Sequence, residues 1–359
     1  MAKKRLFDLP QQKTEFQMRG IVTGVEKKNF FTNKKTKSGV DMNMLNFGIE
    51  FDDKQTAYLT LNGMERDSVY FYNSKDKKTI NVKWADRNKS QAEGYRMIGV
   101  NLGLERDEED EGNIKYTMTE YDAAKYASQH LKDEMSVFVK GSVEFDSYTN
   151  DKGETKRTTK LIPSQISLCS KPVNFEEEDY EALADFKTNL VFDSIEQEKD
   201  EAGKPTGRFI VNALSVGYAT ITNTEFIVLN AELASKLKKN MKPNWAIEAT
   251  GVFASTVLTE TVESDEDEWG EKSSFDRVSA PRKFEMIITG CKPSTIDKES
   301  YSENAIAEAR KAIANKDKAE KSFGESKKDD DKAPWSDNDD SLEDDWSWGL
   351  LKWSHWGRY

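Results

Sequence analysis

Val137-Phe138-Val139-Lys140-Gly141 and its later counterpart Trp245-Ala246-Ile247-Glu248-Ala249-Thr250-Gly251 indicate which fold this chain adopts. Each apolar run follows a similar stretch, which spans residues 130–135 in the first copy and 236–241 in the second. Upstream, Ile21-Val22-Thr23-Gly24-Val25-Glu26 reappears in outline at residues 190–196, and downstream residues 166–172 are echoed by residues 287–293. Similarity in the same order over spans of domain length predicts duplicated domains rather than a short-period repeat.

Both copies alternate apolar and polar residues in a way that is typical of β-strands. In the first copy we expect strands at residues 14–25, 42–51, 57–61, 69–72, 80–84, 135–146 and 158–168, a charged loop at 106–112 and a helix at 119–132. In the second copy we expect strands at 186–195, 208–216, 225–229, 245–258 and 284–289, with a helix at 231–239. Three strands, a helix and a final hairpin are the order of an oligonucleotide/oligosaccharide-binding (OB) barrel. The predicted fold class is therefore mainly β with a few helices, as two OB-type five-stranded barrels in tandem, followed by a helix and a disordered acidic tail.

The predicted domains follow from this order. Residues 1–172 form the first OB-fold domain and main nucleic-acid-binding module, 173–185 a linker, 186–295 the second OB-fold domain, 296–322 a helical segment, 323–346 a disordered acidic tail, and 347–359 an aromatic and basic extension of uncertain origin. The acidic linker is expected to be a helical strap over residues 174–185, and a helix rich in Ala, Glu and Lys is expected over 303–318.

Composition excludes several classes of protein. No apolar run approaches the roughly 18 residues of a membrane span, and no apolar stretch follows Met1-Ala2-Lys3-Lys4-Arg5, so we expect a cytoplasmic protein, in the host cytoplasm if it is viral. The sequence has two histidines, no phosphate-binding loop and, in Asp337-Asn338-Asp339-Asp340-Ser341, no complete calcium loop, so we expect no enzyme, cofactor or metal. Cys169 and Cys291 fall at matching places in the two copies without C-x-x-C spacing, so we expect free thiols.

The charge is unevenly distributed. The net charge is −12, yet residues 1–50 hold ten Lys and Arg against five Asp and Glu, a balance of +5. Acidic blocks concentrate at residues 176–179, 265–268 and 329–345. The folded head can therefore be locally basic while the whole chain is acidic.

Basic and aromatic residues are interleaved in two loops of the first copy. The first turn contains Lys27, Lys28, Phe30, Phe31, Lys34, Lys35 and Lys37, and the last hairpin contains Tyr148, Lys152, Lys156 and Arg157, around a strong turn signal at Asn150-Asp151-Lys152-Gly153. These are the loops that flank the binding face of an OB barrel, where cations follow phosphates and rings stack on bases. Tyr70 and Tyr72 share one face of their predicted strand and offer a further platform. Taken singly, each aromatic ring is more typical of a core position or an ordinary surface position. The lysines, taken singly, are typical of a surface that keeps the protein in solution. Their occurrence together favours binding.

The second copy shows fewer features that favour nucleic-acid binding. Lys199, Lys204 and Arg208 occupy its first turn, but its last connection, residues 260–271, is acidic and would repel phosphate. Trp245 is expected to pack rather than stack. This domain binds weakly, supports the first, or contacts protein.

The tail, with Asp329-Asp330-Asp331, Trp335 and Asp344-Asp345-Trp346, resembles the acidic tip of bacterial and bacteriophage single-stranded DNA-binding proteins. With residues 137–141 and the hairpin at 148–157, the chain looks like a phage-type relative with tandem OB domains. The resemblance implies non-specific protection of single-stranded DNA in replication, recombination or repair, with Asp329, Asp330, Asp331, Trp335, Asp344, Asp345 and Trp346 recruiting protein partners. A plain solubilising tail would not explain the tryptophans. Self-association stays open, and no membrane partner is expected.

Two alternatives remain at this point. One is a structural or adaptor virion protein that uses OB barrels for protein or glycan contacts, and the other is a recombination mediator or annealing accessory protein. Residues 347–359 depart from the resemblance, because that family stops at or just after its acids. We interpret them as an appended extension or a product of an altered reading frame, ahead of a partner-binding peptide or a membrane-interface anchor.

Overall fold

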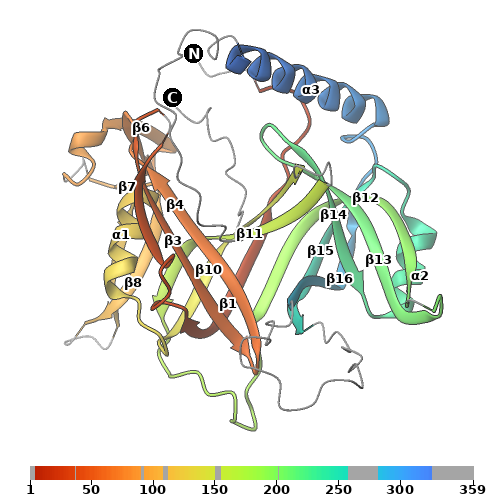
Figure 1. The fold of residues 1–359 in the computed structure, drawn as a ribbon, viewed down its shortest axis with the longest axis horizontal. Helices are drawn as coiled ribbons and strands as arrows, with labels where there is room; N and C mark the ends of the chain where they lie inside the picture. The colour runs from red at the N-terminus through yellow and green to blue at the C-terminus, as the bar shows by residue number, and fades with distance from the viewer. Residues whose placement is uncertain are drawn as a thin grey trace, which may run out of the picture.

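The protein folds into two β-barrels that share one continuous sheet (Figure 1). This computed structural model describes residues 5–36, 38–89, 93–107, 112–149, 155–200, 202–257 and 282–325. The first barrel consists of β1 (Thr14–Thr23), β3 (Asp41–Asp52), β4 (Gln55–Met64), β10 (Ser136–Thr149) and β11 (Thr155–Leu168). The second consists of β12 (Ala184–Lys199), β13 (Pro205–Val216), β14 (Ile221–Val228), β15 (Ala246–Val257) and β16 (Arg282–Asp297).

Each barrel closes in the way that defines an OB fold. Four pairings in the first barrel are antiparallel, β1 with β3, β3 with β4, β1 with β10 and β10 with β11, and the circle closes where β11 lies parallel to β4 at Leu161 and Leu59. The second barrel repeats this circuit and closes where β14 and β16 pair in parallel at Ile227 and Ile287. The expected pair of OB-type five-stranded barrels is confirmed.

One helix connects the third and fourth strands of each barrel. These helices are α1 (Glu120–His130) and α2 (Ala231–Asn240), and the side chains of Thr119 and Asn230 accept hydrogen bonds from the free N–H groups of their first turns. Such caps satisfy donors that have no partner inside the helix. A third helix, α3 (Glu303–Glu325), follows the second barrel and buries Ile306 and Ala309 beside Leu9 and Tyr301.

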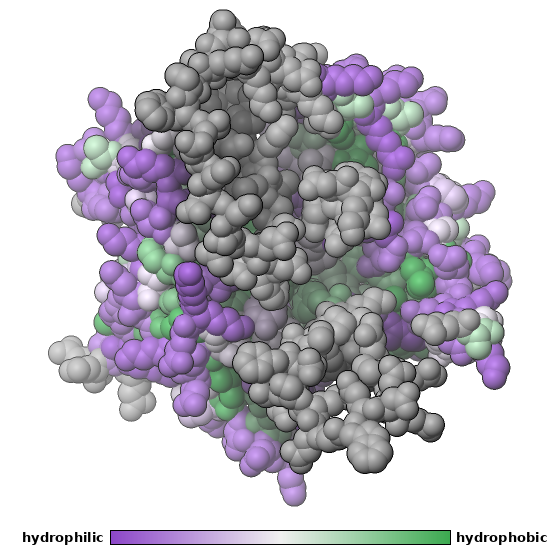
Figure 2. Space-filling view, in the orientation of Figure 1, coloured by the Kyte–Doolittle hydropathy of each residue, from purple (hydrophilic) through white to green (hydrophobic). Residues whose placement is uncertain are grey.

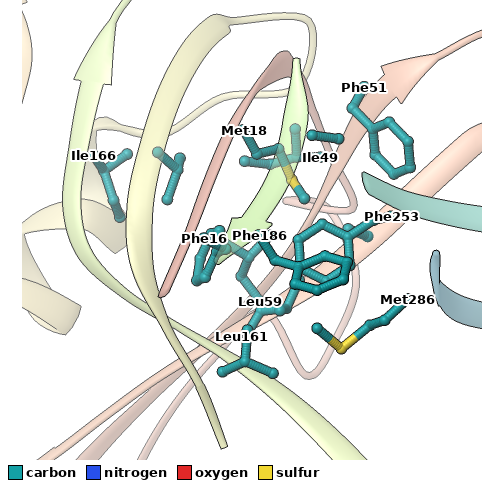
Figure 3. Packing of buried hydrophobic residues seen from close by; sticks show 14 of the residues in the cluster. Phe16, Met18, Ile49, Phe51, Leu59, Leu161, Ile166, Phe186, Phe253 and Met286 are labelled. Carbon is teal, nitrogen blue, oxygen red and sulfur yellow. The ribbon is translucent and has the colours of Figure 1, made fainter. Parts of the chain in front are cut away.

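The two barrels are related by an approximate twofold axis. Their first strands, β1 and β12, pair antiparallel with Phe16 opposite Phe186. The two rings are equivalent, because each lies against the glycine, Gly141 or Gly251, at which a Cβ atom would come within 2.0 Å of a carbonyl oxygen of the neighbouring strand. In Figure 3 the ring of Phe253 lies among these aromatic residues, with centroids 6.4 Å from Phe16 and 5.5 Å from Phe186. One apolar core therefore spans both barrels.

The first barrel carries an insertion that the second lacks. Between β4 and α1 lie β5 (Ser68–Asn73), β6 (Lys78–Lys83), the 3₁₀ turn η1 (Trp84–Asp86), β7 (Tyr95–Met97), β8 (Val100–Arg106) and β9 (Asn113–Met118). The strands β6, β5 and β7 form a separate sheet in that order, whereas β8 pairs in parallel with β11. Residues 69–72 and 80–84 form strands as expected, but they pair in this separate sheet and do not extend the sheet of the barrel.

Four other expectations need correction. The turn after β1 contains a short edge strand, β2 (Phe31–Lys35). The helix α3 continues to residue 325, so residues 323–325 of the expected disordered tail are helical. Residues 326–346 lie outside the described residues. The linker forms turns rather than a helical strap, because Tyr180 folds back and its hydroxyl donates to the Phe51 carbonyl at 2.7 Å. Cys169 and Cys291 are free thiols as expected, but they do not occupy equivalent positions in the two barrels. Cys291 pairs with Ala249 where the first barrel pairs Ile166 with Val139, so Cys169 lies three residues beyond the equivalent place.

Hydrophilic residues cover most of the described surface that is visible in Figure 2, and apolar residues reach it in small patches. None of the helices in the described part of the chain combines the length and the hydropathy needed to cross a bilayer.

Candidate nucleic-acid interface

The outer face of β3 and β4 carries an exposed aromatic ring. Tyr58 lies in the middle of β4 and keeps 60% of its surface exposed, while its neighbours Ala57 and Leu59 point inward and are fully buried. Opposite Tyr58 on β3 is Gly48, which has no side chain to cover the ring. Beside it, the Thr60 hydroxyl donates to the Asn46 side-chain oxygen at 3.0 Å. A flat ring with polar neighbours on a rigid strand is a suitable platform for a nucleobase.

The turn before β2 places a cation on this ring. It begins at Gly24, which has a φ of 85°, and the Val25 N–H donates to a carboxylate oxygen of Asp133 at 2.8 Å. The turn also rests on β3, where the Asn46 amide donates to the Asn29 carbonyl at 3.1 Å. With both ends of the turn held, the Lys27 ammonium lies 5.2 Å from the centroid of the Tyr58 ring.

The phenylalanines of this turn pack inward. Phe30 is 8% exposed and belongs to the hydrophobic core, and Phe31 is half-buried against the same cluster. The prediction that Phe30 stacks on bases was wrong, and the ring of Phe31 is largely taken up by packing. The turn buries its apolar side chains and leaves Lys27 and Lys28 on the outside.

The lysines of β2 divide between two faces. Lys34 lies opposite Met42, which in turn lies opposite Met64. Opposed residues of antiparallel strands point to the same side, and Met64 is six residues from Tyr58, so Lys34 shares the outer face with Tyr58. Lys35 points to the other side of the sheet, and Lys37 lies outside the described residues.

The last hairpin lies beside the start of β4. Because β11 is in register with β4 at Leu161 and Leu59, Arg157 lies four residues earlier, near the start of β4, whereas Lys34 lies near its end. Arg157 instead forms an ion pair with Glu225 of the second barrel. The backbones of Tyr148 and Lys156 pair with each other, and Lys152 lies outside the described residues. Arg157 and Lys34 thus lie at opposite ends of β4, whereas Lys27 lies above Tyr58, three residues from the start of that strand. That the two basic loops share one groove stays a prediction.

Tyr70 and Tyr72 lie in the separate sheet of β5, β6 and β7, away from the barrel strands. Their alternation is as predicted, with Phe71 buried and Tyr72 40% exposed. The residues predicted to bind partners all lie outside the described residues, namely Asp329, Asp330, Asp331, Trp335, Asp344, Asp345 and Trp346.

The second barrel has a carboxylate at the position of Tyr58. Glu225 pairs with Asn212 of β13 in the place where Tyr58 pairs with Gly48. The expected cation Arg208 is occupied, because its guanidinium lies 2.7 Å from a buried carboxylate, Glu285, and 2.8 Å from Glu198. The corresponding face of the second barrel is therefore poorly suited to phosphate.

Trp245 is half-buried against the core, as expected for a packing residue. The ammonium groups of Lys242 and Lys298 lie 5.5 and 4.8 Å from its ring centroid. No group of three potential metal ligands occurs among the residues that the structure describes.

Sequence reasoning missed Tyr58, although a signal was present. Ala57-Tyr58-Leu59-Thr60-Leu61 alternates strictly, so a large ring at the polar phase of the alternation indicates an outward aromatic residue.

The strand order defines the class of protein: a tandem OB-barrel protein. The sequence matches the model of the YorF family over residues 72–326, and the chain belongs to this family. No curated protein matches it.

Among solved structures, the chain is similar to a deletion mutant of the single-stranded DNA-binding protein from Thermus aquaticus, with 15% identity, a TM-score of 0.35, and coverage of 78% of this chain and 93% of that chain. The wild-type protein from Thermus aquaticus is similar at 13% identity, a TM-score of 0.35, and coverage of 79% and 93%. Similarity at this level supports no statement about function, and the strand pairing alone defines the fold.

Proposed function

We propose that this protein binds single-stranded DNA without sequence preference, through the outer face of β3 and β4 in the first barrel. The observation that carries the proposal is the Lys27 ammonium above the exposed ring of Tyr58. Tyr58 offers a π-face to any base, and Lys27 and Lys34 on the same face offer charges to the phosphates on either side. No base-specific pocket is needed for this mode of binding.

The second barrel supports the first in this account. Residues 1–172 would hold the strand, and residues 186–295 would hold the first barrel in place through the β1–β12 pairing and the shared core. A carboxylate at the Tyr58 position and the pairing of Arg208 with two glutamates support this division of work. The protein acts by binding, and no catalytic step is assigned to it.

The resemblance of the tail to phage single-stranded DNA-binding proteins supports a role in DNA replication or recombination, with residues 329–346 recruiting partner proteins. Deletion of residues 326–359 should leave the affinity for DNA intact or raise it, because the tail carries an excess of carboxylates. The same deletion should abolish retention of replication or recombination proteins from a phage-infected extract. If the truncated protein retains the same proteins, the tail has no recruiting role.

The decisive test is a titration of oligo-dT and of a duplex of equal length over a series of salt concentrations. Binding to phosphates releases counterions, so the logarithm of the association constant should fall with the logarithm of salt by about 0.7 for each single-strand phosphate contact. Lys27→Ala should lower that slope by about one contact, whereas Lys238→Ala on α2 should leave it unchanged. A flat salt dependence, or equal affinity for the duplex, would exclude the proposed function and favour an adaptor protein.

A further inference from the structure

The separate sheet of β5, β6 and β7 is not needed to close the first barrel. It lies in the insertion between β4 and α1, and in Figure 1 its strands β6 and β7 lie together near α1, on the side of the molecule away from the second barrel. We call it the accessory sheet. An element that adds nothing to barrel closure and extends the surface of one barrel only is a candidate for a function of its own.

The accessory sheet is firmly attached to the barrel. The guanidinium of Arg87, just after η1, forms two hydrogen bonds with the Asp122 carboxylate on α1, at 2.6 and 3.0 Å. The same guanidinium stacks 4.3 Å from the centroid of Trp84, whose ring meets Tyr121 of α1 edge to face. Both partners of the ion pair are mostly buried, with side-chain exposures of 18% and 21%. A ligand on this sheet would therefore meet a surface in a fixed position.

The two faces of the accessory sheet differ in chemistry. Val69 and Phe71 point to one side and are 6% and 5% exposed. Tyr70 and Tyr72 point to the other side, where register places Arg96 of β7 directly opposite Tyr72. Tyr72 is 40% exposed and Arg96 is exposed, so a ring and a guanidinium lie side by side on an open surface.

The cations of this sheet are open to a ligand. Lys75 and Lys77 lie in the turn from β5 to β6, Lys78 begins β6, and all three are exposed. Among the described residues, these three lysines and Arg96 form no ion pair. Arg87, by contrast, is committed to Asp122. Phosphates could approach the free cations without displacing an internal carboxylate.

The accessory sheet adjoins the Lys34 end of the proposed interface. β5 begins four residues after β4 ends, and the Glu65 N–H donates to the Asp41 carbonyl at 3.0 Å, which prolongs the ladder of β3 and β4 to this point. Lys34 lies opposite Met42 on the same end of that ladder. A DNA strand that crosses Tyr58 and leaves past Lys34 would therefore reach the accessory sheet.

We infer that the Tyr72 and Arg96 face of the accessory sheet is a second contact for single-stranded DNA, continuous with the Tyr58 face. The inference rests on the proposed function and extends it, because the strand occupied by one chain would be longer than one OB barrel needs. A tyrosine ring beside an unpaired guanidinium on one open face suits a base and a phosphate better than it suits an apolar protein surface. An acidic peptide is the other ligand that such a face could attract.

The test compares a short with a long oligo-dT. An OB barrel covers about 4–16 nucleotides, so oligomers of about 8 and about 30 nucleotides separate the barrel from its extension. The variant Tyr72→Ala/Arg96→Ala should bind the 8-mer like the wild type and bind the 30-mer about tenfold more weakly, with a salt slope lower by about 0.7. The control Tyr218→Ala/Lys238→Ala, which makes the same kind of change on the second barrel, should bind both oligomers normally.

Each outcome has one meaning. If the wild type binds neither oligomer, the proposed function itself fails. If the wild type binds both and the accessory-sheet variant binds the 30-mer equally well, this inference is overturned while the proposed function stands. If the variant loses only the binding of a synthetic peptide of residues 323–346, the sheet holds an acidic peptide and the inference is likewise overturned. Thermal melting of the variant should match that of the wild type, because both substituted side chains are exposed.

Discussion

Tyr58→Ala and Phe30→Ala should separate binding from folding, although both remove an aromatic ring from the same part of the first barrel. Tyr58 is 60% exposed, so its removal takes little apolar surface out of the core. Base stacking on one ring contributes about 1–3 kcal/mol, so Tyr58→Ala should weaken oligo-dT binding by roughly 5- to 150-fold. The free energy of unfolding should change by less than about 0.5 kcal/mol, as for other surface substitutions.

Phe30→Ala should have the opposite profile. Truncation of a buried phenylalanine costs about 3–5 kcal/mol, and the lower end applies here because Phe30 keeps 8% of its surface exposed and lies in a turn. At about 2–4 °C for each kcal/mol, the melting temperature should fall by roughly 6–12 °C. The turn should still form, because its hydrogen bonds are made by the backbone: the Phe30 N–H donates to the Lys27 carbonyl at 2.9 Å and its carbonyl accepts from Asn46 at 2.8 Å.

The assay is fluorescence anisotropy of labelled oligo-dT at a temperature where urea unfolding shows both variants to be folded, with Tyr218→Ala as the matched control. Phe30→Ala should bind within about twofold of the wild type. If Phe30→Ala lost as much affinity as Tyr58→Ala while folded, the assignment of Phe30 to the core would be refuted. If Tyr58→Ala bound normally, the Tyr58 face would not be the interface.

Three further predictions concern other parts of the molecule. Glu225→Gln should free Arg157 from its ion pair and steepen the salt dependence of DNA binding by about 0.7. Stability should change by less than about 1 kcal/mol, because both side chains are about half exposed. An unchanged slope would mean that Arg157 does not reach the DNA. Burial tends to raise the pKa of Asp122, but hydrogen bonds from Arg87 and Thr119 outweigh it and leave that pKa below its ordinary value of 3.8. Its contribution to stability is thus present above pH 3.8 and lost as the pH falls through the lower, folded-state pKa, so Asp122→Asn should flatten the acid limb of urea unfolding measured between about pH 5 and pH 2. Burial raises the pKa of the Cys291 thiol to about 11, so roughly one thiol in 1,000 is ionised at pH 8 and iodoacetamide should label it slowly until urea is added; fast labelling of the folded protein would contradict this burial.

The barrels could be predicted from sequence because their signals are local or repeated. Alternation marks the strands, Thr119 and Asn230 mark the helix starts, and the second copy confirms the order of the first. The accessory sheet could not be assigned in this way, because the segment at 69–72 alternates like a barrel strand. Its separation from the barrel is decided by which strands it pairs with, and pairing partners leave no mark on so short a segment.

Sequence could indicate which segments of the candidate site are basic and aromatic, but not which of their side chains point outward. Composition drew attention to the turn that contains Lys27, but neighbouring aromatic residues cannot be sorted into inward and outward positions when the turn that carries them has no regular period. Phe30 was therefore assigned to the interface from sequence, although the structure buries it. The cysteines illustrate a similar limit, because both closing hairpins contain a bulge and a shift of a few residues in register is invisible in sequence.

The ion-pair partner of Arg157 could not be predicted from sequence, because it lies in the second barrel. Its hairpin has the composition of a DNA-binding loop, yet the β1–β12 pairing brings the second barrel within reach, and Phe145 at the base of the hairpin packs against Phe226 with ring centroids 6.0 Å apart. No local sequence pattern in the first barrel predicts that Arg157 forms an ion pair with a residue 68 positions later.

The most direct test of the Tyr58 interface is photochemical crosslinking of the intact protein to oligo-dT that carries 5-iododeoxyuridine, followed by trypsin digestion and mass spectrometry. Cleavage after Lys54 and Arg66 isolates residues 55–66, in which Tyr58 is the sole aromatic residue. We expect the principal adduct in this peptide, at Tyr58, and its loss in Tyr58→Ala. Adducts confined to residues 205–228 of the second barrel would contradict the account.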